Sequence, residues 1–499
     1  MAIKKTAVKT NNTAKSPTNS SFKRKLITAL FVLAEYIFII ALYFAQYSIL
    51  IRIFLALASL IIVGIIITKI NNLIGGYGSY IYGGNFGINF IDKLSKNCKG
   101  FWIFISEWGL VMGFGLLSYI IFKNKISKKA LVSGVVSILL FIIVLYPYLL
   151  VAFQFINIPN LTNTIAQTTS ISTPSLQFSI LGYILLVISV IGGFSFFIFI
   201  ALISGAVQML TALFSVVSSV VASTPNYTPL ATAVPGLAPL LPGITIPLFA
   251  GILSLIVILV VHEFSHGILS RVYGIKVKKV GIAILGVIPI GAFVEPDENK
   301  LKKIDKNKQN NIFIAGISAN FIFAIIFFLF LVVFLIYIIP TMSSGTYLYI
   351  SGVFKGSPSY NVIPLGSILK QWNGVNVTNI SVLEAAAKAD KPFTKVTVLT
   401  NVSEYNLTAN STGKIGVLIN SETIPKSGLY YTIMLFLYQF IALSFMLNFL
   451  VAVLNLLPLP FFDGWRIYKN ILSNRKLKIL SIFTVLLLLL LALPWFFIL

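Results

Sequence analysis

The chain has 499 residues, of which 58% are apolar and only 10% are charged, and its mean hydropathy is +0.96. This composition excludes an ordinary soluble protein, in which about 25% of residues are charged. The formal net charge of +24 would suit a nucleic-acid-binding protein, but the basic residues collect in the first 25 residues and in short connectors, as in cytoplasmic loops of membrane proteins. We therefore predict a polytopic α-helical membrane protein without a nucleic-acid partner.

The N-terminal half combines a basic tail with long apolar stretches. Residues 1–25 are rich in lysine and hold no acidic residue, which predicts a disordered cytoplasmic tail. Residues 26–245 form a multi-span region to which we assign no role. Glu35 and Glu107 lie in apolar stretches there, where they either mark a second polar site or pair with Arg52 or the backbone.

Stretches of about 20 apolar residues can span a hydrocarbon core of about 30 Å. The sequence predicts such stretches at residues 27–46, 48–69, 101–122, 130–153, 179–222 (long enough for two spans), 247–273, 310–339, 429–456 and 478–498.

The only two histidines of the chain stand four residues apart in one of these stretches, as His262-Glu-Phe-Ser-His266. On a helix, positions i and i+4 share a face, so both imidazoles can reach one metal ion. The pattern is that of zincins, in which two histidines bind zinc and the glutamate, here Glu263, is the general base. The alternative is a chance pentapeptide whose histidines form hydrogen bonds between helices.

Two further elements follow the histidine helix and complete the first part of a candidate catalytic core, residues 246–340. Residues 277–294 alternate apolar and β-type residues around glycines and a proline, which predicts a hairpin that dips into the membrane surface. The next apolar helix carries Asn320, whose amide could bind a scissile carbonyl or its developing oxyanion or join two helices by a hydrogen bond.

A polar insert, residues 341–426, interrupts the apolar pattern. Its stretch 366–377 predicts a strand, an Asn-Gly turn and a second strand, residues 381–389 predict a short helix, and residues 393–400 predict another strand. At about 86 residues the insert is long enough for one small α+β domain.

The insert is also expected to lie outside the cell. Asn-x-Ser/Thr triplets, acceptors for glycosylation, start at Asn376, Asn379, Asn401, Asn406 and Asn410, and elsewhere at Asn160 and Asn226. Their clustering favours an outward-facing domain, so the lysine-rich connectors 276–308 and 466–478 face the cytoplasm. The tail and the loop 223–246 then lie on opposite sides of the membrane, which requires an odd number of crossings between them. Six candidate stretches precede residue 245, so one of them must be re-entrant or merged.

The second part of the core, residues 427–499, offers the third metal ligand. A catalytic zinc takes three protein ligands, and without a third histidine the remaining one must be a carboxylate. Asp463 follows Pro458 and Pro460, which break the helix at this depth; its other reading is a cap of the next helix. Asn455 is a second candidate for substrate or oxyanion contact, with the same alternative as Asn320.

Four motifs in this order resemble the site-2 protease family of intramembrane metalloproteases, above all its archaeal members. They are the His-Glu-Phe-Ser-His helix, the hairpin ending in Gly-Ala-Phe-Val-Glu-Pro-Asp-Glu, the Gly-x-x-x-Asn helix and the stretch Asn-x-x-Pro-x-Pro-x-x-Asp-Gly. The resemblance covers about residues 247–499, and the insert 341–426 resembles the PDZ domain found at this position in many members.

The resemblance implies a zinc metalloendopeptidase that cleaves transmembrane helices of membrane-anchored substrates in regulated intramembrane proteolysis. One Zn²⁺ per chain would be bound by His262, His266 and Asp463, with Glu263 as the base. The implied partners are a transmembrane protein substrate, the lipid bilayer and a peptide ligand of the PDZ-like domain.

Two other functions compete with this one. The first is a transporter or channel with a structural or regulatory zinc, which the large N-terminal half keeps open. The second is a membrane zincin of the type that acts on prenylated proteins, which takes its third ligand from a downstream glutamate helix that is not found in this sequence.

Overall fold

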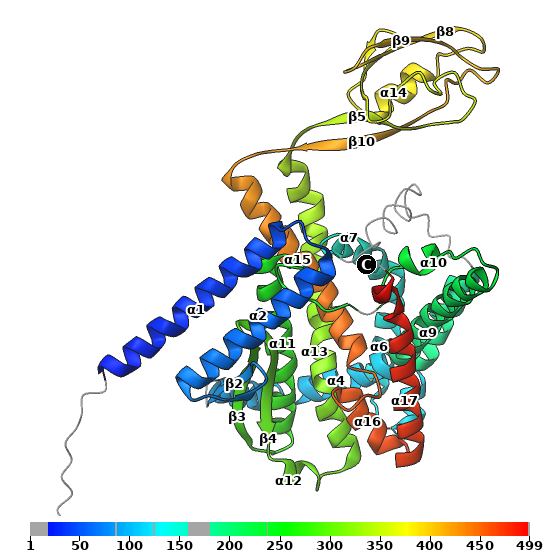
Figure 1. The fold of residues 1–499 in the computed structure, drawn as a ribbon. Coiled ribbons are helices and arrows are strands. Elements are labelled where there is room, and N and C mark those ends of the chain that lie inside the picture. Colours follow the sequence, from blue (N-terminus) through cyan, green and yellow to red (C-terminus); the bar gives the residue numbers. More distant parts are fainter. Residues whose placement is uncertain (1–17, 85–86, 123–124, 158–179, 237, 498–499) are drawn as a thin grey trace, which may run out of the picture. The chain divides into compact units, whose positions relative to one another are not determined.

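The fold was examined in a computed structural model, in which residues 18–84, 87–122, 125–157, 180–236 and 238–497 are described (Figure 1). The chain divides into two compact units, of which the first comprises Met1–Leu329 with Gln439–Leu499 and the second comprises Phe330–Tyr438.

The first unit is mainly helical. Before the histidine helix come α1 (Thr18–Phe44), α2 (Ile49–Asn71), α3 (Ile88–Asn97), α4 (Lys99–Phe114), α5 (Leu117–Ile121), α6 (Lys128–Leu140), the π-helix η1 (Phe141–Leu145), α7 (Tyr146–Phe153), α9 (Ile180–Val221) and α10 (Thr228–Ala231). The histidine helix and those after it are α11 (Leu248–Val272), α12 (Glu298–Leu301), α13 (Lys306–Val333), α15 (Leu429–Leu454), α16 (Asp463–Ile471), α17 (Asn474–Leu491) and the 3-10 helix η4 (Leu493–Phe496).

Within the described part of the chain, seven helices are long and apolar enough to cross a membrane, so the chain is a polytopic helical membrane protein. They are Phe22–Phe44, Ile49–Asn71, Lys128–Leu145, Tyr183–Val221, Leu248–Val272, Lys306–Met342 and Leu429–Leu454. The predicted stretches 101–122 and 478–498 are not among them.

A break in the helix explains the first of these differences. The stretch 101–122 divides into α4 and α5 at Gly115, which has a φ of 59°, and α9 is bent beside it at Gly193, with a φ of 66°. The Leu116 N–H at the break donates to the Val190 carbonyl at 3.0 Å. Because backbone groups need protein partners at membrane depth, the two irregular helices satisfy each other. The stretch 179–222 accordingly holds two helices joined across this kink within α9, and together they count as one candidate span, Tyr183–Val221.

The predicted tail is corrected at its inner end. Helix α1 begins at Thr18, so residues 18–25, which we expected in the disordered tail, are helical. Lysine and arginine are good helix formers, and the helix therefore extends beyond the apolar stretch. Residues 1–17 lie outside the described part of the chain.

A four-stranded antiparallel sheet joins the two halves of the sequence. Its strands are β1 (Ile74–Gly76), β2 (Ser79–Gly84), β3 (Val277–Leu285) and β4 (Ile288–Pro296), in the order β1-β2-β3-β4. The pair β3–β4 is the predicted hairpin. The first two strands, missed in the sequence, meet at Tyr77 and Gly78, whose φ angles of 52° and 81° form the two-residue turn typical of tight hairpins. Strand β4 is a free edge and packs beside α11 (Figure 1).

The second unit holds an antiparallel sheet. Its elements are the π-helix η2 (Phe334–Ile338), the 3-10 helix η3 (Ile339–Met342), β5 (Ser343–Val353), β6 (Ile368–Trp372), β7 (Val375–Asn376), α14 (Ile380–Ala387), β8 (Lys395–Thr400), β9 (Glu404–Thr408) and β10 (Val417–Pro425). The strand order is β10-β5-β6-β8-β9, with β7 paired to β6. The predicted Asn-Gly turn is present, with positive φ at Asn373 and Gly374. Leu348, Ile350 and Val398, all fully buried, lie in its core.

The asparagines that begin the clustered triplets carry local hydrogen bonds. The Asn379 side chain caps α14 by accepting from the Val382 N–H at 3.0 Å, and the Asn410 side chain accepts from the Thr412 N–H at 2.9 Å in a turn. Turn and cap chemistry therefore explains asparagine at these positions without glycosylation. The triplet at Asn160 lies outside the described residues.

Candidate metal centre

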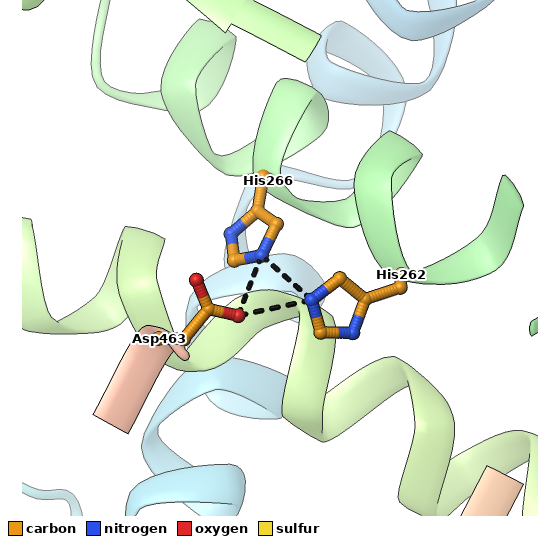
Figure 2. Close-up of side chains that lie close together, drawn as sticks. All are labelled: His262, His266 and Asp463. Atoms are coloured by element: carbon orange, nitrogen blue, oxygen red, sulfur yellow. Dashed lines mark hydrogen bonds and ion pairs between the residues drawn. The ribbon is translucent and has the colours of Figure 1, made fainter. Parts of the chain in front are cut away.

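Three side chains from distant parts of the sequence point at one another (Figure 2). The Oδ2 atom of Asp463 lies 2.9 Å from Nε2 of His262 and 3.0 Å from Nε2 of His266, and the two Nε2 atoms are 3.2 Å apart. His262 is buried, and the other two residues are half-buried. Among the described residues, this is the group of histidine, cysteine and acidic side chains whose ligand atoms lie close enough to hold a metal ion.

Local structure explains how each of the three side chains is directed toward the other two. The two histidines lie one turn apart on α11, as the i, i+4 spacing requires. Asp463 is the first residue of α16, directly after the proline-containing break. A Cβ on Gly464 would stand 2.6 Å from the Leu456 carbonyl carbon, and the Gly464 N–H donates to the Asn455 carbonyl at 2.7 Å. The absence of a side chain at 464 therefore lets the break close tightly enough to aim Asp463 inward.

The far side of each imidazole ring also has a partner. Nδ1 of His266 lies 2.7 Å from the Ile312 carbonyl. When Nε2 binds a metal, Nδ1 carries the proton, and this carbonyl accepts a hydrogen bond from the Nδ1–H group. Nδ1 of His262 lies 3.1 Å from the amide nitrogen of Asn320, and the buried Oδ1 of that amide has no hydrogen-bond partner in the described structure. Half a turn of the amide would place Oδ1 against Nδ1 and give His262 the same kind of acceptor.

The donor set fits zinc in kind and in spacing. Ligand atoms about 2.0–2.1 Å from a tetrahedral zinc lie about 3.3 Å apart, and the observed triangle, with sides of 2.9 to 3.2 Å, is only slightly tighter. Space beside the two nitrogens depends on Gly316 of α13. A Cβ there would stand 2.5 Å from Nε2 of His262 and 2.6 Å from Nε2 of His266. The site thus contains a cradle that any side chain at 316 would fill.

Glu263 connects the metal centre to the sheet. Its Oε2 accepts a hydrogen bond from the Val294 N–H at 3.1 Å, and Val294 lies on the free-edge strand β4. Amide groups at alternate positions of a strand point to the same side, so the N–H of Ala292 shares this outward edge. The candidate base therefore lies beside the edge strand of the sheet.

The two predicted asparagines differ in their surroundings. Asn320 is fully buried against His262, whereas the Asn455 amide donates to the Val451 carbonyl one turn back in its own helix, at 2.9 Å. Substrate or oxyanion contact stays a prediction for both. Sequence reasoning missed Val294 and assigned no role to Gly316, although this glycine belongs to the Gly-x-x-x-Asn motif and lies four residues before Asn320, on the same helix face.

Beyond the centre, an ion pair holds the end of α11. The guanidinium of Arg271 makes a two-point contact with the Asp92 carboxylate of α3, and this contact lowers the pKa of Asp92 below its ordinary value. Because a bidentate pair of this kind is geometrically specific, it fixes α3 against the last turn of α11.

The two glutamates of the N-terminal half each have their own hydrogen-bond partner. The Glu35 carboxylate accepts from the Ser59 hydroxyl at 2.8 Å, and Glu107 accepts from the Ser127 N–H at 3.0 Å. They belong to different helices, α1 and α4, and neither pairs with Arg52, whose guanidinium donates to the Tyr43 carbonyl.

Comparison with known proteins gives a family match over the part of the chain that holds this centre. Residues 250–493 match the model of peptidase family M50. An uncharacterized protein of Methanocaldococcus jannaschii is 30% identical over 250 residues, which are 48% of this chain and 62% of that protein. A protein of Arabidopsis thaliana described as a membrane-bound transcription factor site-2 protease homolog is 28% identical over 150 residues, 29% of this chain and 28% of that protein. The matches thus span less than two thirds of either relative.

Proposed function

Residues 250–493 belong to peptidase family M50, and from this premise we propose that the protein is an intramembrane zinc metalloprotease. It would hydrolyse peptide bonds within or near transmembrane helices of membrane-anchored substrates. The observation that carries the proposal is the meeting of Asp463 with His262 and His266, whose ligand atoms lie 2.9 to 3.2 Å apart beside Glu263.

The roles of the residues follow from this arrangement. His262, His266 and Asp463 would hold one zinc ion, and Asn320 and the Ile312 carbonyl would keep the two imidazoles in orientation. A bound zinc would lower the pKa of a water molecule to about 7 and polarise the scissile carbonyl. Glu263 would accept the proton of the attacking water and pass it to the leaving amine. The bond from Val294 holds one oxygen of Glu263 in place for this transfer.

A transmembrane substrate must be unwound before it can be cut, because its carbonyls are hidden in i to i+4 hydrogen bonds. The free edge of β4 would pair with the unwound segment and hold it extended beside Glu263. Substrates with Gly or Asn near the cut should therefore be cleaved faster than poly-leucine spans. Equal rates would argue against this part of the mechanism.

The second unit would act as a PDZ-like domain that captures a peptide and controls access. A cavity of about 1030 Å³ lies in this unit between α14, which contributes Leu383 and Ala387, and the segment 413–419, which leads into β10. Strand β10 is an edge of the sheet, so a peptide can add to it as a further strand. Deletion of residues 343–425 should change substrate choice or rate. If both stay unchanged, the proposed role is wrong.

The orientation follows from charge. The N-terminal tail and the connectors 276–308 and 466–478 would face the cytoplasm, because basic loops stay on that side. The domain 341–426 would then lie outside, and α11 would run from the outside to the inside. Accessibility of single introduced cysteines to a membrane-impermeant reagent, measured in a Cys98→Ser background, tests this orientation.

One observation favours the competing function, a transporter or channel with a structural zinc. Broken helices that meet at membrane depth, as α4–α5 and α9 do at Gly115 and Gly193, are typical of transporters. The two functions differ in what they require of Glu263. A protease needs its carboxylate for chemistry, whereas a structural zinc site does not.

The decisive experiment is zinc content together with cleavage of a model single-span substrate, for wild type, Glu263→Gln and Asp463→Ala. We expect Glu263→Gln to keep one zinc per chain and lose cleavage, and Asp463→Ala to lose both. Glu404→Gln, which removes an exposed carboxylate of β9 outside the four motifs, is the matched control and should retain both. Cleavage by Glu263→Gln at the wild-type rate would refute the protease.

A further inference from the structure

An apolar cavity lies between α3, α4, α11 and α13. It measures about 340 Å³, within the usual size range of ligand pockets. Helix α11 lines it with Val261, Phe264 and Ile268. Leu269 lines it as well and lies only about 20° around the helix from His262 at 100° per residue. Helix α13 adds Ala315 and Ala319, the neighbours of Gly316 and Asn320, so α11 and α13 carry both the metal centre and walls of this cavity.

The walls that do not come from α11 and α13 come from the N-terminal half, for which we propose no role above. Phe90 and Leu94 of α3 and Trp102 of α4 line the cavity. The Trp102 indole N–H donates to the Leu94 carbonyl at 2.9 Å and joins the two helices at their corner. Phe90, at 56% exposed, lies at the rim. The cavity is thus walled by apolar side chains and bounded by exposed aromatic ones.

A basic cleft of about 310 Å³ adjoins this cavity at the same corner. It is lined by Asp92, Ser95, Lys96, Lys99, Arg271 and Val272. Neighbouring residues of the same helices line the cavity and the cleft. Leu94 lines the cavity and Ser95 the cleft, and Leu269 lines the cavity and Arg271 the cleft. With one acid against three bases, the cleft is positively charged.

The depth of the two hollows matches the layers of a bilayer. Arg271 stands in the last turn of the candidate span Leu248–Val272, at the level where a span meets the headgroups. Phe264 lies seven residues earlier on α11, about 10 Å deeper at 1.5 Å per residue, and so at the level of acyl chains. The basic cleft thus lies at the level of the headgroups and the apolar cavity at the level of the acyl chains, so the two hollows match the two parts of a phospholipid.

We propose that α3, α4 and α11 form a binding site for an anionic phospholipid, with an acyl chain in the apolar cavity and the phosphate in the basic cleft. Basic pockets between membrane helices recognise such headgroups through charge. Asp92 holds Arg271 in the cleft by the two-point contact, and Lys96 and Lys99 supply the excess positive charge. The lipid would brace α11 against α3 and α4, which gives the α3–α4 corner a role.

The cavity contains its own reporter, Trp102. The full-length protein is placed in phosphatidylcholine nanodiscs, and phosphatidylglycerol with brominated acyl chains is titrated in while tryptophan fluorescence is followed. Brominated phosphatidylcholine is titrated in parallel. The difference between wild type and Trp102→Phe isolates the quenching of Trp102 from that of the other tryptophans. This readout is independent of proteolysis, so failure of the proposed enzyme activity would leave it intact.

We expect the anionic lipid to quench Trp102 at a mole fraction about five- to twentyfold lower than the zwitterionic lipid does, since each basic residue near the surface contributes about fivefold. The double variant Lys96→Ala/Lys99→Ala should lose most of this preference. The control Lys300→Ala/Lys303→Ala removes the same charge from exposed positions outside the cleft and should keep it.

Three results would overturn the proposal. Equal quenching by the two lipids would exclude a headgroup site, and an equal loss of preference in both double variants would show a general surface-charge effect. Relief of the quenching when an excess of a single-span substrate is added to Glu263→Gln would assign the cavity to the substrate and not to a lipid.

Discussion

The substitution Gly316→Ala tests the metal centre through a single methyl group. The added Cβ would stand 2.5 Å from Nε2 of His262, about 0.9 Å inside the shortest ordinary van der Waals contact of 3.4 Å, so one or both imidazoles must move. Metal-ligand distances are held to about 0.2 Å, and the required shift is several times larger. Overpacking costs about 1–3 kcal/mol, whereas alanine gains about 1 kcal/mol of helix propensity over glycine. Folding should therefore change little while zinc binding suffers.

The expected result is a fall in zinc affinity of at least about 10- to 100-fold, the range found when the surroundings of metal ligands are disturbed, together with loss of cleavage. Zinc content is measured by elemental analysis of the purified protein, affinity by competition with a chelator, and folding by thermal unfolding in detergent. The matched control is Gly100→Ala, a helical glycine of α4 whose Cβ would meet no atom within 4 Å. It should leave zinc and cleavage unchanged.

Gly316→Ala with one tightly bound zinc and wild-type cleavage would refute the reasoning, because the ion could not then lie beside both Nε2 atoms. Loss of zinc accompanied by a large drop in unfolding temperature would instead indicate that the helix had been displaced. Comparison with the control variant separates this outcome from selective loss of the ion.

Three further predictions follow from named contacts. Asn320→Ala removes the amide beside Nδ1 of His262 and should weaken zinc binding about 10- to 100-fold. Unchanged zinc affinity in the chelator competition would show that Asn320 does not orient His262 for the metal. Ala292→Pro deletes an outward N–H of the free edge without touching the Val294 bond, and should lower the cleavage rate about tenfold or more while zinc content stays at one per chain. Asp92→Asn should lower the free energy of unfolding by about 1 kcal/mol at pH 7. Because the Arg271 contact lowers the pKa of Asp92, this contribution is present above the ordinary carboxyl value of 3.8 and is lost as the pH falls below it, so the two unfolding curves should converge in acid.

Much of the architecture could be predicted from local pattern. The long apolar stretches predicted a membrane protein, and the alternating residues of 277–294 predicted the hairpin β3–β4. The predicted span over residues 101–122 failed because of a backbone irregularity. Apolar residues continue on both sides of Gly115, so composition alone indicates one span. The hydrogen bond that stabilises the break comes from the neighbouring bent helix α9.

The sequence by itself determined that His262 and His266 share a face at membrane depth, because helical spacing is a local property of five residues. It also determined that a third ligand must be a carboxylate, from the absence of any other histidine. Only the tertiary structure decided that Asp463, 197 residues beyond His266, reaches them, that Gly316 leaves room beside them, and that β4 presents Val294 to Glu263. These juxtapositions depend on the packing of distant segments, which is a sum over many weak contacts and leaves no periodic trace in the chain.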